Sequence, residues 1–402
     1  STRTIQAGDF YLPLKGASFD GEKFINQAFE KGAIGAFCTG DNGTLQVQNT
    51  LTAYLQLANY RRKKLNFTVV AITGSSGKTT TKELAASVLS EKFRTFKTPL
   101  NHNNEIGFCQ TIFEAPDDTE ILVLEMGMRG LGEIELLSKY AEPDITIISN
   151  VGTAHIGRLG SRENIAKAKC EIVKYQRGNI FIAHDDELIK KTVQFSGKKI
   201  FYSIKDVKIL EKDTHYSKFE YYENIYELNV GGDYNIENAL SAINTGLALG
   251  MKVNEIQSGL KKYSPIEKRW EAVNAGGFEI INDSYNANPE SMRAFIDTIF
   301  ELYKKPVVIL GDMGELGEDE IKYHSELGKY INSHKNLRQD AEILSIGKLS
   351  KYITDGVTNC PAKHFETIEQ AAAYLKNKDT KVQLFLKASR SMKFERIIEE
   401  LK

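Results

Sequence analysis

The sequence predicts an α/β protein of three domains, and three observations support this prediction. The chain has 402 residues, more than one ordinary domain of roughly 100–200 residues holds. Apolar, β-rich runs alternate with amphipathic helical segments, as in a doubly wound parallel sheet. A basic cluster at 61–64 and a Ser-Pro pair at 264–265 mark boundaries. We therefore expect domains at 1–65, 66–265 and 266–402.

The first two domains each show regular alternation of strands and helices. In the first, the expected elements are strands 9–14 and 33–38 and helices 24–31 and 51–62. In the central domain, they are strands 67–72, 121–125 and 145–150 and helices 78–91, 134–140 and 236–249. A parallel sheet of this kind binds ligands at the carboxyl ends of its strands.

The remaining segments are a short excursion and a second large α/β unit. Residues 198–230 contain only short strand-like pieces, which we interpret as peripheral to the central sheet. The C-terminal domain is expected to be Rossmann-like, with strands 279–282, 307–310, 342–346 and 382–386 separated by helical segments.

Composition excludes several classes of function. Lys plus Arg (52) and Asp plus Glu (53) nearly cancel, which removes the positive field that nucleic-acid binding requires. The four cysteines form no C-x-x-C pair, so they indicate neither a zinc cluster nor a disulfide framework and favour a reducing cytoplasm. No run approaches the roughly 18 apolar residues of a membrane span. We expect a cytoplasmic monomer without nucleic-acid partners.

Residues 73–80, Thr-Gly-Ser-Ser-Gly-Lys-Thr-Thr, have the context of a phosphate loop, between an apolar β-run and a helix. Glycines let backbone N–H groups converge on phosphate oxygens, and Lys78 can bridge the outer phosphates. The alternative interpretation is a Gly/Ser turn that begins a helix and binds no ligand. The nucleotide-binding residues expected here are Gly74, Ser75, Ser76, Gly77, Lys78, Thr79 and Thr80.

Two other strand ends carry polar groups. Glu125 closes a buried strand, where a metal ligand belongs, although a strand-end carboxylate can also simply face water. His155 follows the strand that ends at Asn150, but a lone histidine is more often a surface or satisfied core residue. Three strand ends deliver polar groups to one edge of the sheet. This convergence favours a role in ligand binding for Glu125 and His155 over a purely structural one.

Together these residues resemble the Mur ligase family. The shared patterns are T-G-[ST]-x-G-K-T-[ST] at 73–80, a metal-binding glutamate at Glu125, N-x-G-x-x-H at 150–155 and A-K-x-E-I at 168–172. The resemblance implies ATP and two Mg²⁺ ions, the first held by Thr79 and Glu125 and the second by His155 and a carbamylated Lys169. On spacing alone, Lys169 would be a solvated helix lysine. The implied catalytic residues are Lys78, His155 and Lys169.

Further nucleotide contacts are implied by the same resemblance. Asn235 and Asn238 match asparagines that face the nucleotide, although spacing alone makes Asn235 a plausible helix cap. Residues 268–271 match G-R-x-E, which implies that Arg269 reaches the phosphates, with Lys268 in place of the usual glycine. Asp283 would contact the ribose.

Three segments, 282–292, 310–317 and 386–392, resemble the D-alanyl-D-alanine-adding branch of the family, with Ala388 in place of a usual glycine. The resemblance also extends to a uridine-nucleotide pocket in the first domain and to a loop at 101–107 that faces the muramoyl-peptide. Taken alone, the sequence of this loop would indicate only an ordinary turn without a binding role. The implied substrate-binding residues are Arg3, Lys15, Asp20, Asn101, Asn103, Asn104, Tyr285, Asn286, Asn288, Lys387, Ser389 and Arg390.

The resemblance implies an ATP-dependent ligase that joins UDP-N-acetylmuramoyl-tripeptide to D-alanyl-D-alanine through an acyl phosphate, in peptidoglycan synthesis. The base for the amine is not identified; His324 and several carboxylates are candidates. The alternatives are a sister ligase that adds one amino acid, a folate polyglutamate-type enzyme, a silent nucleotide-binding scaffold and a mechanical or signalling NTPase. The motifs at 283–292 and 386–392 argue against the first two.

Overall fold

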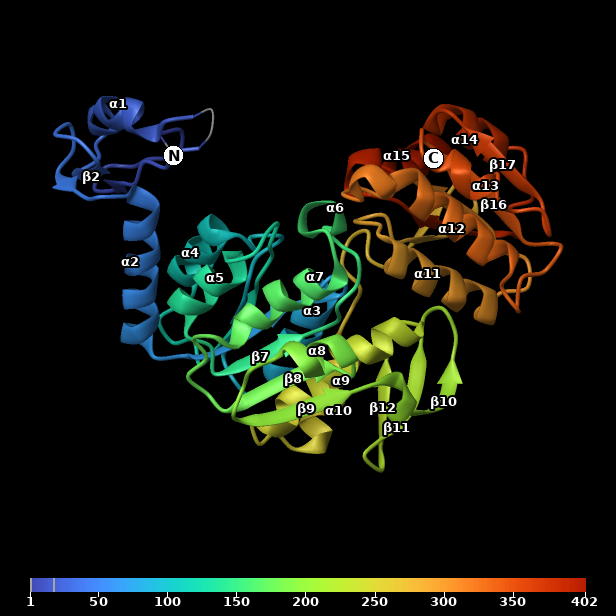
Figure 1. Ribbon diagram of the computed structural model, residues 1–402, viewed down its shortest axis with the longest axis horizontal. Helices are drawn as coiled ribbons and strands as arrows, with labels where there is room; N and C mark the ends of the chain where they lie inside the picture. Colours follow the sequence, from blue (N-terminus) through green and yellow to red (C-terminus); the bar gives the residue numbers. More distant parts are fainter. Residues whose placement is uncertain (1, 17–18) are drawn as a thin grey trace.

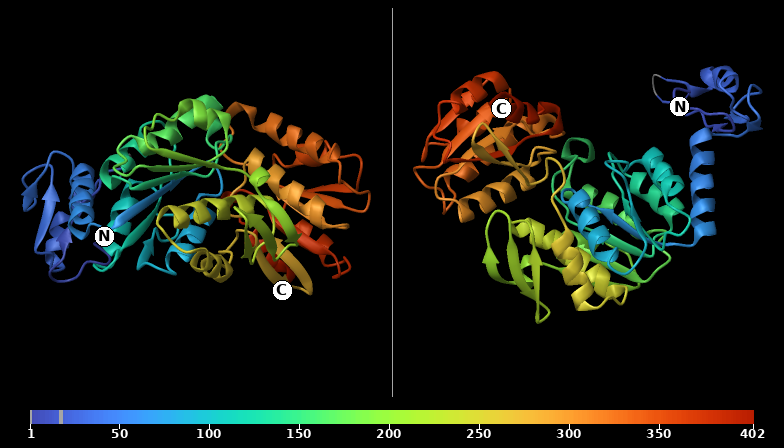
Figure 2. Two further views of the ribbon diagram at one scale, coloured as in Figure 1. Left: turned by 90° about the horizontal axis from the view of Figure 1, so that it is seen from below. Right: turned by 180° about the vertical axis from the view of Figure 1, so that it is seen from behind.

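The computed structural model describes residues 2–16 and 19–402 and confirms the predicted α/β class. Figure 1 shows a small N-terminal unit at one end, a large central body and a C-terminal body at the other end. The view from behind in Figure 2 has the same arrangement, with the N-terminal unit far from the C-terminal body. The division at residues 65 and 265 remains a proposal.

The N-terminal unit is built on three short parallel strands in the order β1-β2-β3. Its elements are β1 (Phe10–Tyr11), a 3₁₀ turn η1 (Gly21–Phe24), α1 (Ile25–Glu30), β2 (Gly35–Cys38) and β3 (Leu45–Gln46). The strand expected at 9–14 is therefore only two residues long, since Pro13 has no N–H to continue a ladder. The unit has its own small core around Ile25 and Ala28.

The central body contains a six-stranded, wholly parallel sheet in the order β5-β6-β4-β7-β8-β9. Its strands are β4 (Thr68–Thr73), β5 (Thr95–Lys97), β6 (Ile121–Glu125), β7 (Ile145–Ile148), β8 (Ile180–His184) and β9 (Lys198–Tyr202). Val70 and Ile72 pack into one hydrophobic cluster and Val69 and Ala71 into another. Strand β4 is thus buried on both faces, as doubly wound sheets require.

Helices and 3₁₀ turns cover both faces of this sheet. In chain order they are α2 (Thr50–Leu65), α3 (Lys78–Leu89), α4 (Glu105–Glu114), α5 (Glu133–Ala141), α6 (Ile156–Leu159), α7 (Arg162–Cys170), η2 (Glu171–Val173), α8 (Glu187–Thr192), η3 (Ile204–Asp206), α9 (Asp233–Ala248) and α10 (Val253–Lys262). Helix α9 begins at Asp233 with Gly232 as its N-cap. The expectation that Asn235 caps this helix is therefore wrong, because that residue lies inside the first turn.

The interpretation of residues 198–230 as a peripheral excursion needs correction in its first part. Strand β9 pairs with β8 and forms the edge of the central sheet. Only the rest of the segment is separate, an antiparallel sheet of β10 (Lys208–Lys212), β11 (Ser217–Tyr221) and β12 (Asn224–Leu228).

The C-terminal body has a second six-stranded sheet, in the order β13-β14-β18-β15-β16-β17, parallel except for β13. Its strands are β13 (Glu271–Ala275), β14 (Phe278–Asn282), β15 (Val307–Gly311), β16 (Glu342–Ile346), β17 (Ala362–Phe365) and β18 (Gln383–Lys387). Its helices and 3₁₀ turns are α11 (Pro289–Leu302), η4 (Gly317–Asp319), α12 (Glu320–Asn332), α13 (Lys351–Thr354), α14 (Ile368–Leu375), η5 (Arg390–Met392) and α15 (Glu395–Leu401).

Helix α2 connects the N-terminal unit to the central body and packs against the latter. Leu55 and Ala58 belong to the hydrophobic cluster on one face of the central sheet. The basic cluster at 61–64 lies inside the last turns of this helix rather than in a linker. Arg62 is completely buried, and its Nε and Nη2 donate to the carbonyl oxygens of Ala141 and Glu142 at 2.8 and 3.1 Å. It thereby satisfies carbonyls that the end of α5 leaves open.

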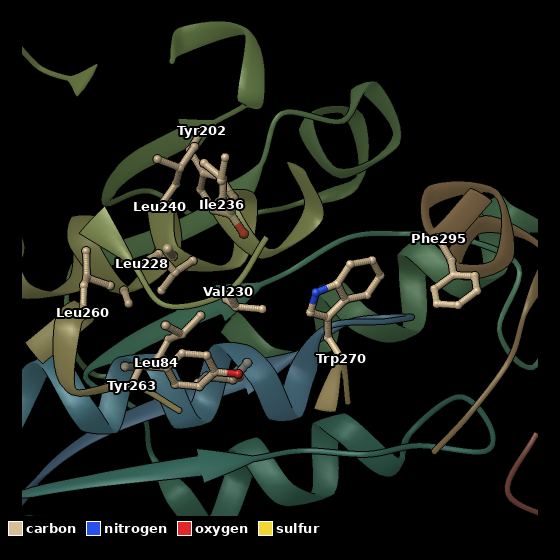
Figure 3. Close-up of a cluster of buried hydrophobic side chains, with 14 of the residues drawn as sticks. Leu84, Tyr202, Leu228, Val230, Ile236, Leu240, Leu260, Tyr263, Trp270 and Phe295 are labelled. Carbon is tan, nitrogen blue, oxygen red and sulfur yellow. The ribbon is translucent and has the colours of Figure 1, made fainter. Parts of the chain in front are cut away.

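Trp270 joins the C-terminal body to the central body. Its Nε1 donates to the carbonyl oxygen of Thr214 at 2.9 Å, and its ring meets Tyr234 and Phe295 edge-on, with centroids 5.7 Å apart in both cases. Figure 3 shows the indole between Val230 and Phe295. One hydrophobic cluster therefore continues across both bodies.

We expect Arg62→Ala to lower the free energy of unfolding by about 3 kcal/mol, because the buried carbonyl of Ala141 and the half-buried carbonyl of Glu142 lose their donor and the packing of a fully buried side chain is lost. The measurement is urea denaturation followed by circular dichroism. The matched control is Lys64→Ala, an exposed position in the same turn, which we expect to change stability by less than about 0.5 kcal/mol. Equal shifts in the two variants would contradict the role assigned to Arg62.

Candidate active site

The loop between β4 and α3 has the geometry of a phosphate loop. Gly77 caps α3 with φ 75°, in the left-handed region that favours glycine. A Cβ atom at Gly77 would also lie 2.5 Å from Oδ1 of Asn238, and one at Gly74 would collide with the side chain of Ser149. Close packing therefore requires glycine at both positions, and at Gly77 the backbone conformation requires it as well.

A second loop, after β7, supports the first one through hydrogen bonds. The N–H groups of Ser75 and Ser76 donate to the carbonyl oxygen and Oδ1 of Asn150, at 3.1 and 2.9 Å. Ser149 Oγ donates to the carbonyl oxygen of Ser76 at 2.6 Å, and the N–H of Gly152 donates to Ser75 Oγ at 2.9 Å. In this conformation the amides of Ser75 and Ser76 bind Asn150, so they support the loop rather than point into it.

Lys78 lies across the loop, with Nζ donating to the carbonyl oxygen of Gly74 at 2.8 Å. Burial lowers the pKa of its ammonium group; Arg269 lowers the pKa further, while Glu125 raises it. Arg269 comes from the C-terminal body, and its Nη2 donates to Oγ1 of Thr79 at 2.9 Å. Two half-buried cations thus meet at the N-terminus of α3, which is itself electropositive. Such a site is suited to a polyanion.

Glu125, at the end of β6, offers a ligand atom for a divalent cation. Its Oε1 accepts from Nδ2 of Asn103 at 2.9 Å. Its Oε2 is buried and accepts no hydrogen bond within the described residues; the ammonium of Lys82 is 3.8 Å away. Burying a carboxylate oxygen without a hydrogen-bond donor costs free energy of folding. Carboxylate oxygens are also ligands that Mg²⁺ prefers. Glu125 and the hydroxyl of Thr79 therefore fit the predicted cation.

Lys169, on α7, is almost completely buried, and within residues 2–16 and 19–402 its amine has no hydrogen-bond or ion-pair partner. Burial, with a further contribution from the charge of Lys78, holds its pKa well below the usual value. The neutral amine that carbamylation requires is thereby favoured. The expectation of a solvated helix lysine, drawn from spacing alone, is wrong.

His155 has φ 66° and lies in a loop that contacts the C-terminal body. Its Nδ1 is 2.6 Å from Oε2 of Glu315, an ion-pair distance without hydrogen-bond alignment. No group of three His, Cys, Asp or Glu side chains that could hold a metal occurs in the part of the chain that the structure describes. Cations at Glu125 and His155 would therefore need ligands from phosphate, water or a modified lysine.

The predicted nucleotide contacts at Asn235, Asn238 and Asp283 already have protein partners. Asn235 Nδ2 donates to the carbonyl oxygen of Gly231 at 2.7 Å, and Asn238 Oδ1 accepts from the hydroxyl of Thr81 at 3.2 Å. Both oxygens of Asp283 are used, by the N–H of Trp270 at 3.2 Å and by the ammonium of Lys387. Thr80 is buried at the start of α3.

Lys268 has φ 61° where the family pattern has glycine. A non-glycine residue in this region costs roughly 1–2 kcal/mol, and ion pairs with Glu267 and Glu395 at 2.6 and 3.3 Å hold the side chain. The backbone shape that glycine would allow is thus kept, and Arg269 points to the phosphate loop. The guanidinium stacks 3.9 Å from the ring centroid of Tyr285.

Several predicted substrate-binding residues have structural roles. Asn104 caps α4 and Asn288 caps α11, each through its side-chain oxygen, and Asn286 accepts from the N–H of Ala287 at 2.9 Å. Ser389 Oγ is 3.2 Å from Ser391 Oγ. The exposed Arg390 pairs with Glu395 at 2.7 Å, and the carbonyl oxygen of Asn101 accepts from the N–H of Asn103 at 2.7 Å.

Arg3, Lys15 and Asp20 belong to the N-terminal unit, at the far end of the molecule from the C-terminal body (Figure 1). Lys15 pairs with Asp20 at 3.3 Å, and Asp20 also accepts from the N–H of Glu22 at 3.0 Å. The structure therefore does not bring these residues to the phosphate loop.

His324 is unsuited to deprotonating a substrate amine. It is completely buried, its Nδ1 donates to the carbonyl oxygen of Glu320 at 2.6 Å, and its Nε2 accepts from the N–H of Met313 at 2.9 Å. Burial lowers its pKa. Both ring nitrogens form hydrogen bonds inside the C-terminal body, so His324 is not available to accept a proton from the substrate amine.

Three charged residues near the site were not predicted as functional. Lys82 is buried and donates to the carbonyl oxygens of Thr98 and Leu100 at 2.8 and 3.2 Å. Glu290 accepts from the hydroxyl of Thr153 at 2.8 Å, and Glu315 pairs with His155. Glu290 and Glu315 lie within motifs typical of the branch, but only contacts between distant segments reveal their partners.

Comparisons with known proteins agree with this geometry. Residues 72–246 match the Mur ligase middle domain, and residues 268–390 match the Mur ligase glutamate ligase domain. The chain is 37% identical to the UDP-N-acetylmuramoyl-tripeptide–D-alanyl-D-alanine ligase of Bacillus subtilis, over 100% of this chain and 92% of that protein. The chain belongs to the Mur ligase family.

Solved structures of this family have the same fold. MurF from Acinetobacter baumannii superposes with a TM-score of 0.91 at 29% identity, covering 100% of this chain and 92% of the other. MurF from Thermotoga maritima, in complex with ADP, superposes with a TM-score of 0.88 at 28% identity, covering 100% and 96%. The three-domain Mur ligase fold expected from the sequence is confirmed.

The lowered pKa of His324 predicts a pH dependence of stability. The unfolded chain binds a proton on this histidine at about pH 6.5, whereas the folded chain binds it only at lower pH. Stability is therefore lost as pH falls below about 6.5. We expect His324→Gln to be less stable than the parent at pH 7.5 by about 1–3 kcal/mol, but to lose less stability between pH 7.5 and 5.5. Urea midpoints at the two pH values measure this, and equal losses would contradict it.

Proposed function

We propose that this chain is an ATP-dependent amide ligase that joins UDP-N-acetylmuramoyl-tripeptide to D-alanyl-D-alanine, giving the pentapeptide precursor of peptidoglycan. The observation that carries the proposal is the convergence of Lys78, Glu125 and Arg269 on one phosphate loop. It occurs in a chain that is similar over its whole length to a ligase with this activity. The ADP complex of the Thermotoga maritima relative supports ATP as the nucleotide.

In the proposed reaction, the terminal carboxylate of the tripeptide attacks the γ-phosphate of ATP, ADP leaves, and the amine of the dipeptide displaces phosphate from the acyl phosphate. The protein contributes positioning and charge neutralisation. Lys78 and Arg269 are placed to offset negative charge on the phosphates. Their partial burial strengthens this effect, because electrostatic interactions are stronger away from bulk water.

We propose two cation positions on the basis of the family motifs and the ligand atoms available. Thr79 and Glu125 would hold the first Mg²⁺, and His155 with a carbamylated Lys169 would hold the second. Bound there, Mg²⁺ would neutralise phosphate charge and fix the phosphate oxygens. The lowered pKa of the buried Lys169 amine supports carbamylation, since only a neutral amine captures carbon dioxide.

The substrate-side assignments rest on motif similarity. We propose that Arg3, Lys15 and Asp20 contact the uridine nucleotide, and that Asn101 and Asn103 face the muramoyl-peptide. The segment 387–390 and the residues around Tyr285 are proposed to approach the dipeptide. Because the N-terminal unit lies away from α3, which begins at the phosphate loop (Figure 1), the two ends of an extended precursor would contact different bodies of the protein.

We also propose a cytoplasmic location and a monomeric state. All four cysteines are free thiols, as in a reducing compartment. Among the described residues, no helix is long and apolar enough to cross a membrane. The substrates named above are small molecules, and no nucleic-acid partner is proposed.

The decisive test of the reaction is phosphate release from ATP and Mg²⁺, with and without UDP-N-acetylmuramoyl-tripeptide and D-alanyl-D-alanine, together with product mass. We expect phosphate only with both acceptors and a product that gains the dipeptide. Lys78→Met should reduce kcat/KM by about 100-fold or more. ATP hydrolysis without acceptors would identify an NTPase instead, and addition of a single amino acid would identify a sister ligase.

Carbamylation can be tested separately from ligation. In ¹³C-bicarbonate, we expect the protein to give a carbamate ¹³C resonance that disappears in Lys169→Arg. The matched control is Lys167→Arg, an exposed lysine on the same helix, which should keep the resonance. A signal that survives in Lys169→Arg would place the carbamate elsewhere.

A further inference from the structure

Two loops from different bodies of the protein meet beside the proposed second cation site. One follows β7 and carries His155, and the other follows β15 and carries Glu315. Both residues have left-handed backbone conformations, φ 66° and 62°, which are unfavourable for non-glycine residues. Such strain persists only where the surrounding structure enforces it, and it is often found at functional sites.

The two loops approach each other at the backbone level. A Cβ atom at Gly157 would lie 2.5 Å from the nitrogen of Gly317, and one at Gly317 would lie 2.8 Å from Cα of Gly157. Glycine on both sides therefore permits a contact that any side chain would block. The contact brings the carboxylate of Glu315 to 2.6 Å from Nδ1 of His155.

We propose that Glu315 is a positioning residue for His155. Its carboxylate engages Nδ1 and orients the imidazole so that Nε2 is available to a divalent cation. This proposal rests on the assignment of His155 as a cation ligand. Metal-binding histidines almost always present their other ring nitrogen to a carboxylate, carbonyl or water, and loss of that partner costs roughly 10–100-fold in metal affinity.

The surroundings of the two ring nitrogens of His155 agree with this role. Nδ1 is buried, and Glu315 is its charged neighbour. Nε2 makes no hydrogen bond to any residue in the ranges 2–16 and 19–402. A modest rotation of the ring or carboxylate would align the N–H with the oxygen, and a bound cation at Nε2 would favour that alignment.

The location of Glu315 has a consequence for the whole molecule. The histidine belongs to the central body and the carboxylate to the C-terminal body. Affinity for the cation is therefore coupled to docking of the two bodies, and by linkage the cation stabilises docking to the same extent.

The test measures cation binding directly. Mn²⁺ is titrated into the full chain with the β,γ-imido analogue of ATP, and free Mn²⁺ is followed by electron paramagnetic resonance. We expect the parent to bind two ions with different affinities, the weaker one at His155. In Glu315→Gln, the affinity of this weaker site should fall by about 10–100-fold. The tighter site should keep its affinity. Glutamine retains the size of the side chain and removes the charge.

Two matched variants make the result specific. Glu290→Gln alters another carboxylate at the same interface, which accepts from Thr153 and does not contact His155; both affinities should stay unchanged. In His155→Asn, the ligand nitrogen is lost while the backbone conformation is retained, because asparagine tolerates the positive φ of this position. We expect this variant to lose the weaker site.

Each other outcome overturns a different statement. If His155→Asn weakens binding but Glu315→Gln does not, the positioning role is wrong and the cation assignment stands. If His155→Asn has no effect, the assignment of His155 as a ligand fails, and the positioning role fails with it. Equal weakening in Glu290→Gln and Glu315→Gln would show that only docking matters. Ligase activity, measured separately, decides the proposed reaction itself.

Discussion

The parallel pairing of β6, β4 and β7 is the constraint on which the active site depends. In this sheet Ile72 is opposite Glu125, and Thr73 is opposite Ile148. Because parallel strands end at the same edge, the phosphate loop, the carboxylate and the loop that carries Asn150 emerge side by side. The strands are buried on both faces, so a one-residue slip in register would turn every side chain toward the other hydrophobic cluster, disrupt the packing of both clusters and separate these groups.

Polar groups at this edge satisfy one another before any ligand binds. Asn150 supports the phosphate loop, Asn103 binds one oxygen of Glu125, and Arg269 binds Thr79. The charged groups that remain close to the phosphate loop are the cations of Lys78 and Arg269, and burial lowers the pKa of Lys78 because its ammonium group is desolvated. Desolvated cations of this kind are stabilised by an anionic ligand, so the site's electrostatics favour a nucleotide triphosphate with its cations.

Sequence patterns located the long, buried elements well and the short, peripheral ones poorly. Strands β6 and β16 have the predicted bounds, because continuous apolar runs in parallel sheets are distinctive. Strands β5 and β17 were not predicted, since they are short and partly exposed at sheet edges. Strand β8, although apolar, was overlooked. Helix α2 was predicted as a helix, but its attachment to the central body through Arg62 depends on partners about 80 residues away in sequence.

The sequence by itself determined the α/β class, the phosphate loop and the motifs that identify the family, because these depend on residues close together in the chain. The tertiary structure decided which side chains are free to act. His324 and Asn235 are committed to internal hydrogen bonds, Lys169 is buried rather than solvated, and Glu315 lies against His155 from another body. Burial and charge pairing arise only when distant segments pack together, and local patterns carry no information about those neighbours.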